Sequence, residues 1–288
     1  MLELTGVASI LRGISILYWI LALGTLALVL WKVRPWWGKA IGTAIVVGVF
    51  GYLPVQESIE ANKLALEKKA REAYAREAWA YFKKKCETEA GEKIYKTFTG
   101  VKSVLVVKPL PTATEKDLFD QFWYGDPYSD ANTYKRAESA ALRLVMDWKH
   151  RGGTGTQKGL DFVEIKNESS NGYTRIHRPL SNDKRAIKEP IQQPVSKFGV
   201  AWEDMSTPED RKFWVAGSRF RVIDLADNSV VAERIGFLIE AGFGSAASQR
   251  RPWLTARGIG PNGRSCPDAH DATDQWFITS VFKQEEGK

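Results

Sequence analysis

Two long runs without charge stand out in the pattern of hydrophobic and polar positions. The first, GISILYWILALGTLALVLW over residues 13–31, is about as long as a helix that crosses the hydrocarbon core of a bilayer. The second, AIGTAIVVGVFGYLPV over residues 40–55, is shorter, and a buried helix is its alternative interpretation. Because only eight residues connect the two runs, we predict an N-terminal two-helix transmembrane hairpin over residues 1–55.

The connection between the runs, WKVRPWWGK, concentrates aromatic and basic side chains. Trp favours the headgroup level of a membrane, and Lys and Arg reach toward water from helix ends. The predicted membrane-interface anchors are Trp31, Lys32, Arg34, Trp36, Trp37 and Lys39. Three cations in a short loop favour a cytoplasmic turn, with both the N-terminus and the C-terminal part outside the cytoplasm. Cations beyond the other ends of the runs, such as Arg12, Lys68 and Arg71, weigh against this orientation.

Small residues recur every four positions in the second run, at Ala40, Ala44 and Gly48. A stripe of this kind lets helix backbones approach closely. We expect it to be a helix-packing stripe that seats the first run. Assembly of an oligomer is the alternative.

Residues 56–95 are rich in Ala, Glu and Lys, which predicts a helical stalk. Acidic and basic residues recur at helical spacing, as Glu67 and Arg71 do. The apolar positions approximate a seven-residue repeat, and they are Ile59, Leu66, Ala73, Trp79 and Phe82. A helix of about 35 residues would be about 50 Å long. Coiled-coil assembly and packing of the helix on its own domain are both compatible with the pattern.

Residues 96–288 alternate between strand, turn and helix patterns. Strands are predicted at 102–109 and 198–205, and hairpins at 159–180 and 218–240. Helices are predicted at 206–214 and 273–283 and at 134–148, where a strand at the end is the alternative, with a short helix or aromatic turn at 117–124. Ser206 and Glu209 have the spacing of a capping box, with Pro208 early in the turn. The fold class is therefore α+β, with the hairpin, the stalk, and a mostly antiparallel sheet domain that ends in a C-terminal helix.

Cys86 and Cys266 are the two cysteines, 180 residues apart. Without a CxxC spacing they do not predict a zinc site or a redox motif. In an oxidising compartment a pair that meets would form a long-range disulfide. Two separate buried thiols are the alternative.

The net charge of +7 is modest for this length. Residues 1–54 hold one acidic and four basic side chains, a sum of +3, so the rest of the chain carries +4. A field this weak does not predict a nucleic-acid partner.

Two loops contain motif-like residues without a complete motif. HRGGTGTQKG at 150–159 lacks the spacing of both the P-loop and the dinucleotide-binding pattern, which predicts an ordinary loop. Carboxylates around His270, namely Asp268, Asp271 and Asp274, are compatible with a divalent cation, but a solvated loop with a helix cap at Asp271 or Thr273 explains them better. We predict no metal and no cofactor.

A third loop, GFGSAASQRRPWLTARG, places guanidinium groups after small residues. The candidate anion-binding or partner-binding residues are Arg250, Arg251, Trp253 and Arg257. Surface arginines without a ligand are the alternative. No GxSxG nucleophile motif accompanies the three histidines, so no catalytic residue and no enzyme activity are predicted.

The run WEDMSTPEDRKFWVAGSRFRVIDLADNSVVAERIGFLIEAG, with CETEAGEKIYKT upstream, resembles a group of small membrane-anchored proteobacterial proteins that have no assigned activity. The resemblance covers most of the chain after residue 55. It implies a Gram-negative inner-membrane setting and no catalytic residue.

These observations predict an inner-membrane protein with two spans that presents a periplasmic α+β domain to an envelope protein or complex, with the lipid bilayer and a homo-oligomer as further partners. One alternative is an envelope ligand-binding or hydrolytic module that uses the Arg-rich loop. Another is a mobile-element membrane protein that blocks entry of foreign DNA. A pocket of convergent polar side chains would favour the ligand-binding module, and a flat apolar patch near the stalk would favour the other two.

Overall fold

The structure is a computed structural model, and the chain divides into two compact units, Met1–Ala73 and Tyr74–Lys288. The described residues are 3–109, 113–123, 125, 137–149, 156–167, 171–179, 186–244, 252–256, 265–267 and 273–283.

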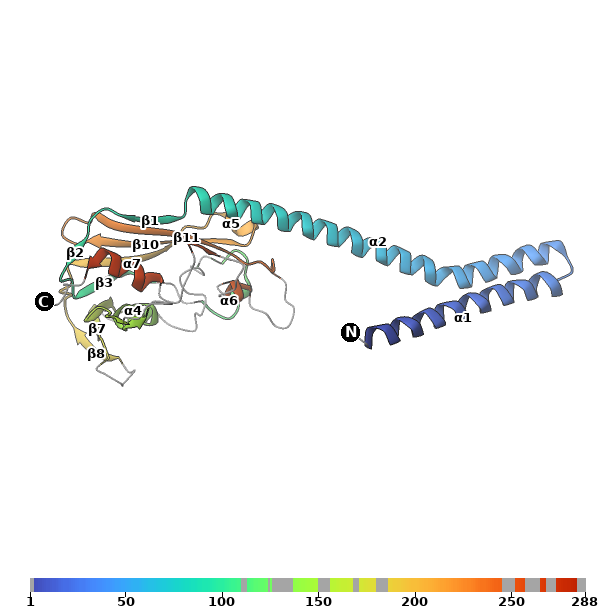
Figure 1. Ribbon diagram of the computed structural model, residues 1–288, viewed down its shortest axis with the longest axis horizontal. Coiled ribbons are helices and arrows are strands. Elements are labelled where there is room, and N and C mark those ends of the chain that lie inside the picture. The colour runs from blue at the N-terminus through green and yellow to red at the C-terminus, as the bar shows by residue number, and fades with distance from the viewer. Residues whose placement is uncertain are drawn as a thin grey trace. The chain divides into compact units, whose positions relative to one another are not determined.

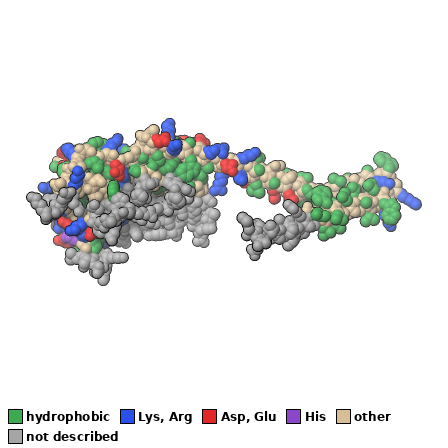
Figure 2. Space-filling view, viewed as in Figure 1, with side chains coloured by type: hydrophobic (Ala, Val, Ile, Leu, Met, Phe, Trp, Pro, Cys, Tyr) green, Lys and Arg blue, Asp and Glu red, His purple; other side chains and the backbone are tan. Residues whose placement is uncertain are grey.

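The first unit is helical. It contains α1 (Glu3–Lys32) and the first part of α2 (Trp36–Thr88), and both helices are long and apolar enough to cross a membrane by length and composition. The two helices lie side by side (Figure 1), with Ala22 and Val46 buried between them. At Gly42 a Cβ atom would lie 2.5 Å from Val29 Cγ1, so this close approach requires glycine. Hydrophobic side chains cover much of the visible surface near the turn between the two helices (Figure 2).

The predicted packing stripe does not face α1. Ala40, Ala44 and Gly48 are all exposed, and a Cβ atom at Gly48 would meet nothing within 4 Å. The residues that face α1, Gly42 and Val46, lie on a different side of α2. The expectation that the stripe packs against the first run is therefore wrong. The residues of α2 that contact α1 lie two positions away from the stripe.

Proline 54 lies inside α2 without ending the helix. Proline has no backbone N–H, so the carbonyl of Phe50, four residues earlier, loses its helical donor. The Tyr18 hydroxyl of α1 donates to this carbonyl at 2.5 Å, and the Tyr18 and Phe50 rings are 5.5 Å apart. A side chain of the neighbouring helix thus satisfies the group that proline leaves open, which is how helices in lipid tolerate proline.

The helix ends earlier than the predicted stalk. After Thr88 the chain turns at Gly91, where φ is +151°, and enters β1 (Gly91–Ile94). Residues 91–95 therefore belong to the sheet region and not to a stalk, and α2 is one helix from the second apolar run into the α+β unit.

The second unit is built on one large, mostly antiparallel sheet. Within the described residues nine strands form it, in the order β1-β11-β10-β9-β3-β6-β7-β8, with β12 also paired to β11. The strands are β3 (Ser103–Lys108), β6 (Phe162–Lys166), β7 (Tyr173–His177), β8 (Ile187–Ile191), β9 (Phe198–Asp204), β10 (Val215–Asp224), β11 (Val230–Ile239) and β12 (Ser265–Cys266). The predicted hairpins are confirmed as β6–β7 and β10–β11, and β3 pairs in parallel with both β6 and β9.

Helices cover both faces of this sheet. On one face α4 (Ala137–Val145) and α7 (Thr273–Val281), the predicted C-terminal helix, pack on Val104, Phe220 and Val222. On the other face the end of α2 packs through Ala78 and Phe82 on strand residues of β10 and β11. The remaining short elements are β2 (Phe98–Thr99), the 3-10 helix η1 (Asp117–Phe119), β4 (Trp148–Lys149), β5 (Thr156–Gln157), α5 (Pro208–Lys212), α6 (Pro252–Ala256) and β13 (Phe282–Lys283).

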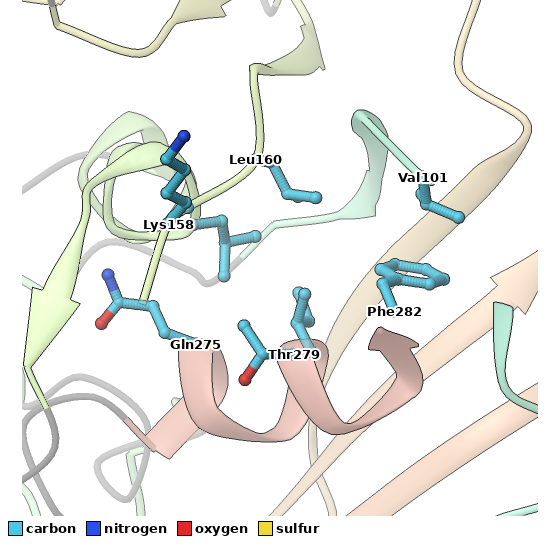
Figure 3. Close-up of a pocket in the computed structure, with 9 residues that line it drawn as sticks. Val101, Lys158, Leu160, Gln275, Thr279 and Phe282 are labelled. Atoms are coloured by element: carbon cyan, nitrogen blue, oxygen red, sulfur yellow. The ribbon is translucent and has the colours of Figure 1, made fainter. Parts of the chain in front are cut away.

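A small cavity of about 40 Å³ lies in the core between α4, α7 and the loops before β3 and β6. Figure 3 shows Lys158, Gln275 and Thr279 beside the apolar side chains of Val101 and Phe282. A cavity of this size has room for water but not for an organic ligand.

Candidate functional site

The end of α2 packs against the short helix α5. Its capping box is formed by Thr207 and Asp210, because the Thr207 backbone N–H and hydroxyl donate to Asp210 Oδ2 while the Asp210 N–H donates to Thr207 Oγ1. The predicted pair, Ser206 and Glu209, is wrong by one residue. Ser206 does not cap the helix, because both its N–H and its hydroxyl donate to Asp204 Oδ1.

One face of α2 holds α5 over three helical turns. The Tyr74 hydroxyl donates to the Lys212 carbonyl at 2.6 Å, and the Tyr81 hydroxyl donates to Asp210 Oδ1 at 2.9 Å. Lys85 Nζ lies 3.5 Å from the same carboxylate oxygen, and Asp210 is fully buried. Burial, together with the hydrogen bond to Asp210, raises the pKa of Tyr81 far above its ordinary value. The tyrosine therefore stays a protonated donor at every physiological pH.

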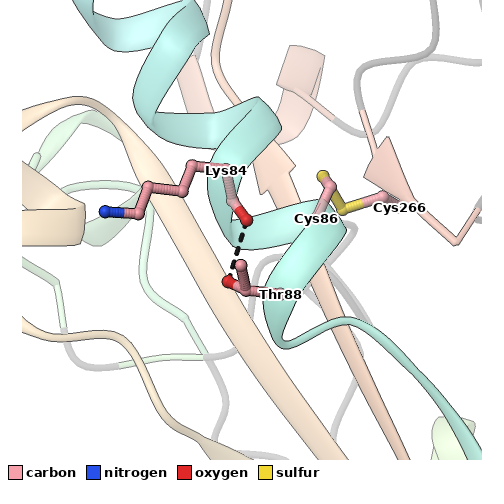
Figure 4. Close-up of a disulfide and its surroundings, with 4 residues drawn as sticks. All are labelled: Lys84, Cys86, Thr88 and Cys266. Carbon is pink, nitrogen blue, oxygen red and sulfur yellow. Dashed lines mark hydrogen bonds between the residues drawn. A yellow bond between two sulfur atoms is a disulfide. The ribbon is translucent and has the colours of Figure 1, made fainter.

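A disulfide fixes the last turn of α2. Cys86 and Cys266 are joined, with their Cα atoms 5.7 Å apart, and Cys266 belongs to β12 beside Phe237 of β11 (Figure 4). In the same turn the Thr88 hydroxyl donates to the Lys84 carbonyl. The end of α2 is thus held by hydrogen bonds at α5 and by a covalent bond at the sheet.

Arg211 connects α5 to the segment around η1. It is buried, and its Nη2 donates to Asp204 Oδ2 and to the Gly125 carbonyl, both at 2.9 Å. Its guanidinium also lies 4.8 Å from the centre of the Trp253 ring. A buried cation with a carboxylate, a carbonyl and an indole around it is a structural arrangement, and nothing in it resembles a nucleophile with a base.

Trp253 is part of this core and not of an exposed loop. The side chain is fully buried, its Nε1 donates to the Asp120 carbonyl at 2.6 Å, and its ring lies 5.3 Å from that of Trp214. The expectation that it stacks beside a ligand at the surface is therefore wrong. Arg250, Arg251 and Arg257, which complete the predicted loop, lie outside the described residues.

Asp274 is the described member of the carboxylate group predicted around His270. Its two oxygens accept hydrogen bonds from Arg234 Nη2 at 2.6 Å and from Trp202 Nε1 at 3.0 Å. Burial alone would raise the pKa of Asp274, but Arg234 and Trp202 lower it below its ordinary value. These contacts hold α7 on β9 and β11. Asp268, His270 and Asp271 lie outside the described residues, as do residues 150–155 of the glycine-rich loop.

Two exposed aromatic side chains belong to the segment that contacts α5. Phe119 and Phe122 are 41% and 50% exposed, and between them Gln121 Nε2 donates to the carbonyls of Arg211 and Lys212. The Lys212 carbonyl is also the acceptor of Tyr74. We name this pair the Phe119/Phe122 patch; the segment that carries it and Tyr74 of α2 both contact the Lys212 carbonyl of α5.

Sequence reasoning did not single out Tyr74, Tyr81, Asp210 or Arg211. A signal was present for α2, because Tyr74, Ala78, Tyr81 and Lys85 follow the spacing of one helix face. For Asp210 the local signal was its capping-box spacing from Thr207, whereas its contact with Tyr81, 129 residues away, left no local signal. Comparison of the chain with protein-family models, with curated proteins and with solved structures finds no match.

Proposed function

We propose that this chain is a membrane-anchored interaction protein. In this proposal α1 and the first part of α2 cross a bacterial inner membrane as a hairpin, and the α+β unit binds another envelope protein on the periplasmic side. The observation that carries the proposal is that a helix with an exposed apolar first part continues, as one element, into the core of a water-compatible domain.

The turn between α1 and α2 supports the membrane location. Trp31 and Trp36 are 79% and 81% exposed, beside the exposed Lys32 and Arg34. Exposed indoles in water cost free energy, whereas at the headgroup level of a bilayer both the indoles and the cations are favourably placed. The turn therefore fits a membrane interface better than it fits water.

The disulfide supports the periplasmic side. Disulfides persist in oxidising compartments and are rare in the cytosol. The Cys86–Cys266 pair joins segments 180 residues apart, so it stabilises the whole α+β unit and not one loop.

Labelling of thiols in whole cells tests the sidedness. Free thiols are blocked first, and a maleimide that adds mass is then applied before and after reduction, with Cys86→Ser and Cys266→Ser as controls. We expect both cysteines to react only after reduction, and each single variant to expose the remaining thiol. Reaction of both thiols without reduction, in permeabilised but not in intact cells, would place the domain in the cytoplasm.

The Phe119/Phe122 patch is the surface we propose for the protein partner. Apolar aromatic side chains beside a rigid scaffold are typical of the centre of interfaces. A photo-crosslinking amino acid at position 119 or 122, in the full chain in whole cells, should give one adduct of discrete mass. The matched control is the same amino acid at position 95. Tyr95 directly follows the edge strand β1 and is 57% exposed. Equal adducts at all three positions, or none at 119 and 122, would contradict the proposed surface.

A further inference from the structure

The starts of three neighbouring strands meet at one edge of the sheet. β3 runs parallel to both β6 and β9, with Ser103 opposite Phe162 and Leu105 opposite Gly199. Parallel strands begin at the same edge, so the segments that enter them are brought together although they are far apart in sequence.

A groove of about 610 Å³ opens at this edge, between residues 97–103 and residues 195–198. Its basic side chains are Lys102 and Lys197, and its hydroxyl groups include those of Thr97 and Thr99. Among these described lining residues there is no Asp or Glu. A volume of this size is typical of small-molecule sites.

The charge of the two lysines is not neutralised within the part of the chain that the structure describes. Neither Lys102 nor Lys197 makes an ion pair there, and both are exposed to the groove. The neighbouring concave surface at Asp161 and Arg178 differs, because Arg178 pairs with Asp161 and lies 3.5 Å from Asp147. Among the described residues that line it, the groove thus presents two cations and no anion.

A buried carboxylate holds the wall of the groove that residues 195–198 form. Glu164 is fully buried and accepts hydrogen bonds from the N–H groups of Val195 and Ser196, from the Ser196 hydroxyl and from Arg175. Burial alone would raise the pKa of Glu164, but these hydrogen bonds lower it below its ordinary value, so it stays an ionised anchor. Its charge is matched by Arg175 and does not neutralise the lysines.

The floor of the groove is aromatic. Phe98 and Phe198 both line it, and their ring centres are 4.5 Å apart. A rigid aromatic floor with two cations and hydroxyl donors at its rim suits a ligand that has a compact anion on an organic group.

We propose that this groove binds a phosphate monoester, with Lys102 and Lys197 as the cations that receive the phosphate. Lysine is a compact point charge and binds phosphate without the planar geometry that an arginine fork imposes. The same headgroup chemistry is offered by a soluble sugar phosphate and by phosphatidic acid. The site is separate from the Phe119/Phe122 patch and does not depend on the protein partner proposed above.

Residue-resolved lysine acetylation of the full chain in an uncharged detergent tests the proposal. The probes are inorganic phosphate, glucose 6-phosphate and phosphatidic acid in the micelle, each compared with chloride at equal ionic strength. With a probe at ten times its dissociation constant, the acetylation rates of Lys102 and Lys197 should fall about tenfold. Lys93 and Lys108, which are exposed on other parts of the sheet, should react unchanged. Protection by glucose 6-phosphate indicates a soluble source of the ligand, and protection by phosphatidic acid alone indicates a lipid.

A second measurement uses matched variants. Phosphate should raise the melting temperature of the unmodified chain and of Lys93→Gln/Lys108→Gln, but not of Lys102→Gln/Lys197→Gln. The proposal is overturned if no probe protects the two lysines, if chloride protects them equally, or if the two double variants respond alike.

Discussion

The two units expose opposite kinds of surface. In the apolar part of the helical unit, residues 15–55, Leu23 and Trp31 are mostly exposed, and the charged side chains lie only at the turn, at Lys32, Arg34 and Lys39. In the α+β unit Trp202, Phe220 and Phe237 are fully buried, and polar side chains form much of the surface. The same residue types thus lie outside in one unit and inside in the other. This difference is what the proposed membrane location predicts, with hydrocarbon around the apolar part of the first unit and water around the second.

Charged groups show the same difference. The α+β unit buries Asp210, Arg211, Arg234 and Glu164, each with an oppositely charged or hydrogen-bonding partner. In the described part of the helical unit between Ser15 and Trp31 there is no charged side chain at all. A buried ion is tolerated only where partners replace its hydration, whereas an apolar helix surface in lipid offers no such partners.

The largest effect is expected from breaking a buried pair in the α+β unit. Asp274→Asn removes the negative charge that compensates Arg234, which is almost fully buried. Leaving one member of a buried pair uncompensated typically costs about 3–5 kcal/mol. Urea unfolding of the full chain in detergent, followed by tryptophan fluorescence, measures the change in the free energy of unfolding.

The matched control for that variant is Glu189→Gln. Glu189 is 50% exposed and contacts His177 and Arg175 at the surface. Removing a surface pair typically costs less than about 1 kcal/mol. Equal losses for the two variants would show that the pair of Arg234 and Asp274 is not a buried one in solution.

A charge placed in the helical unit should have a comparable cost, in the free energy of membrane insertion and not of unfolding. Leu23→Arg replaces a side chain that is 63% exposed, and in water such a change is nearly neutral. At the centre of a membrane span it costs about 3 kcal/mol of insertion free energy. The control is Val195→Arg in the α+β unit, where the side chain is 62% exposed. Alkaline extraction should release more of the first variant than of the second, and equal release would contradict the assignment of different solvents.

Acid should destabilise the α+β unit through its buried carboxylates. The folded-state pKa values of Asp274 and Glu164 lie below their ordinary values of 3.8 and 4.5. Their stabilisation is therefore complete above the ordinary values and is lost as the pH falls through the lower, folded-state values. The free energy of unfolding, measured from pH 7 down to acid, should decline below about pH 4, and it should decline less steeply in Asp274→Asn. A decline that begins near neutral pH would point to other groups.

Local pattern was sufficient for much of the second unit. β6–β7 and β10–β11 were predictable, because alternating residues flank short turns in each hairpin. The position of β3 between β9 and β6 was not predictable, since both of its neighbours are far away in sequence and pair in parallel. The groove at the edge of these strands follows from that pairing. The sequence alone therefore does not predict that Lys102 and Lys197 line the same groove.

The capping box shows a second limit. Ser206 with Glu209 and Thr207 with Asp210 have identical spacing, so the sequence does not distinguish them. The choice depends on Asp204, which occupies Ser206, and on Tyr81, which reaches Asp210 from α2. The first contact is local, because Asp204 lies two residues before Ser206, and only the second is tertiary. A tertiary contact therefore helps to decide a local feature.

The smallest expected effect tests the hydrogen bond between Tyr18 of α1 and Phe50 of α2. Tyr18→Phe removes the donor to the Phe50 carbonyl, and hydrogen bonds between membrane helices contribute about 0.6 kcal/mol on average. In a Pro54→Ala background residue 54 regains an N–H for that carbonyl, so the loss caused by Tyr18→Phe should shrink toward zero. The four chains of this double-mutant cycle are compared by separating the helices with sodium dodecyl sulfate, followed by energy transfer between dyes on α1 and α2. An equal loss in both backgrounds would mean that the tyrosine does not compensate for the proline, and that Phe50 finds another donor in the membrane.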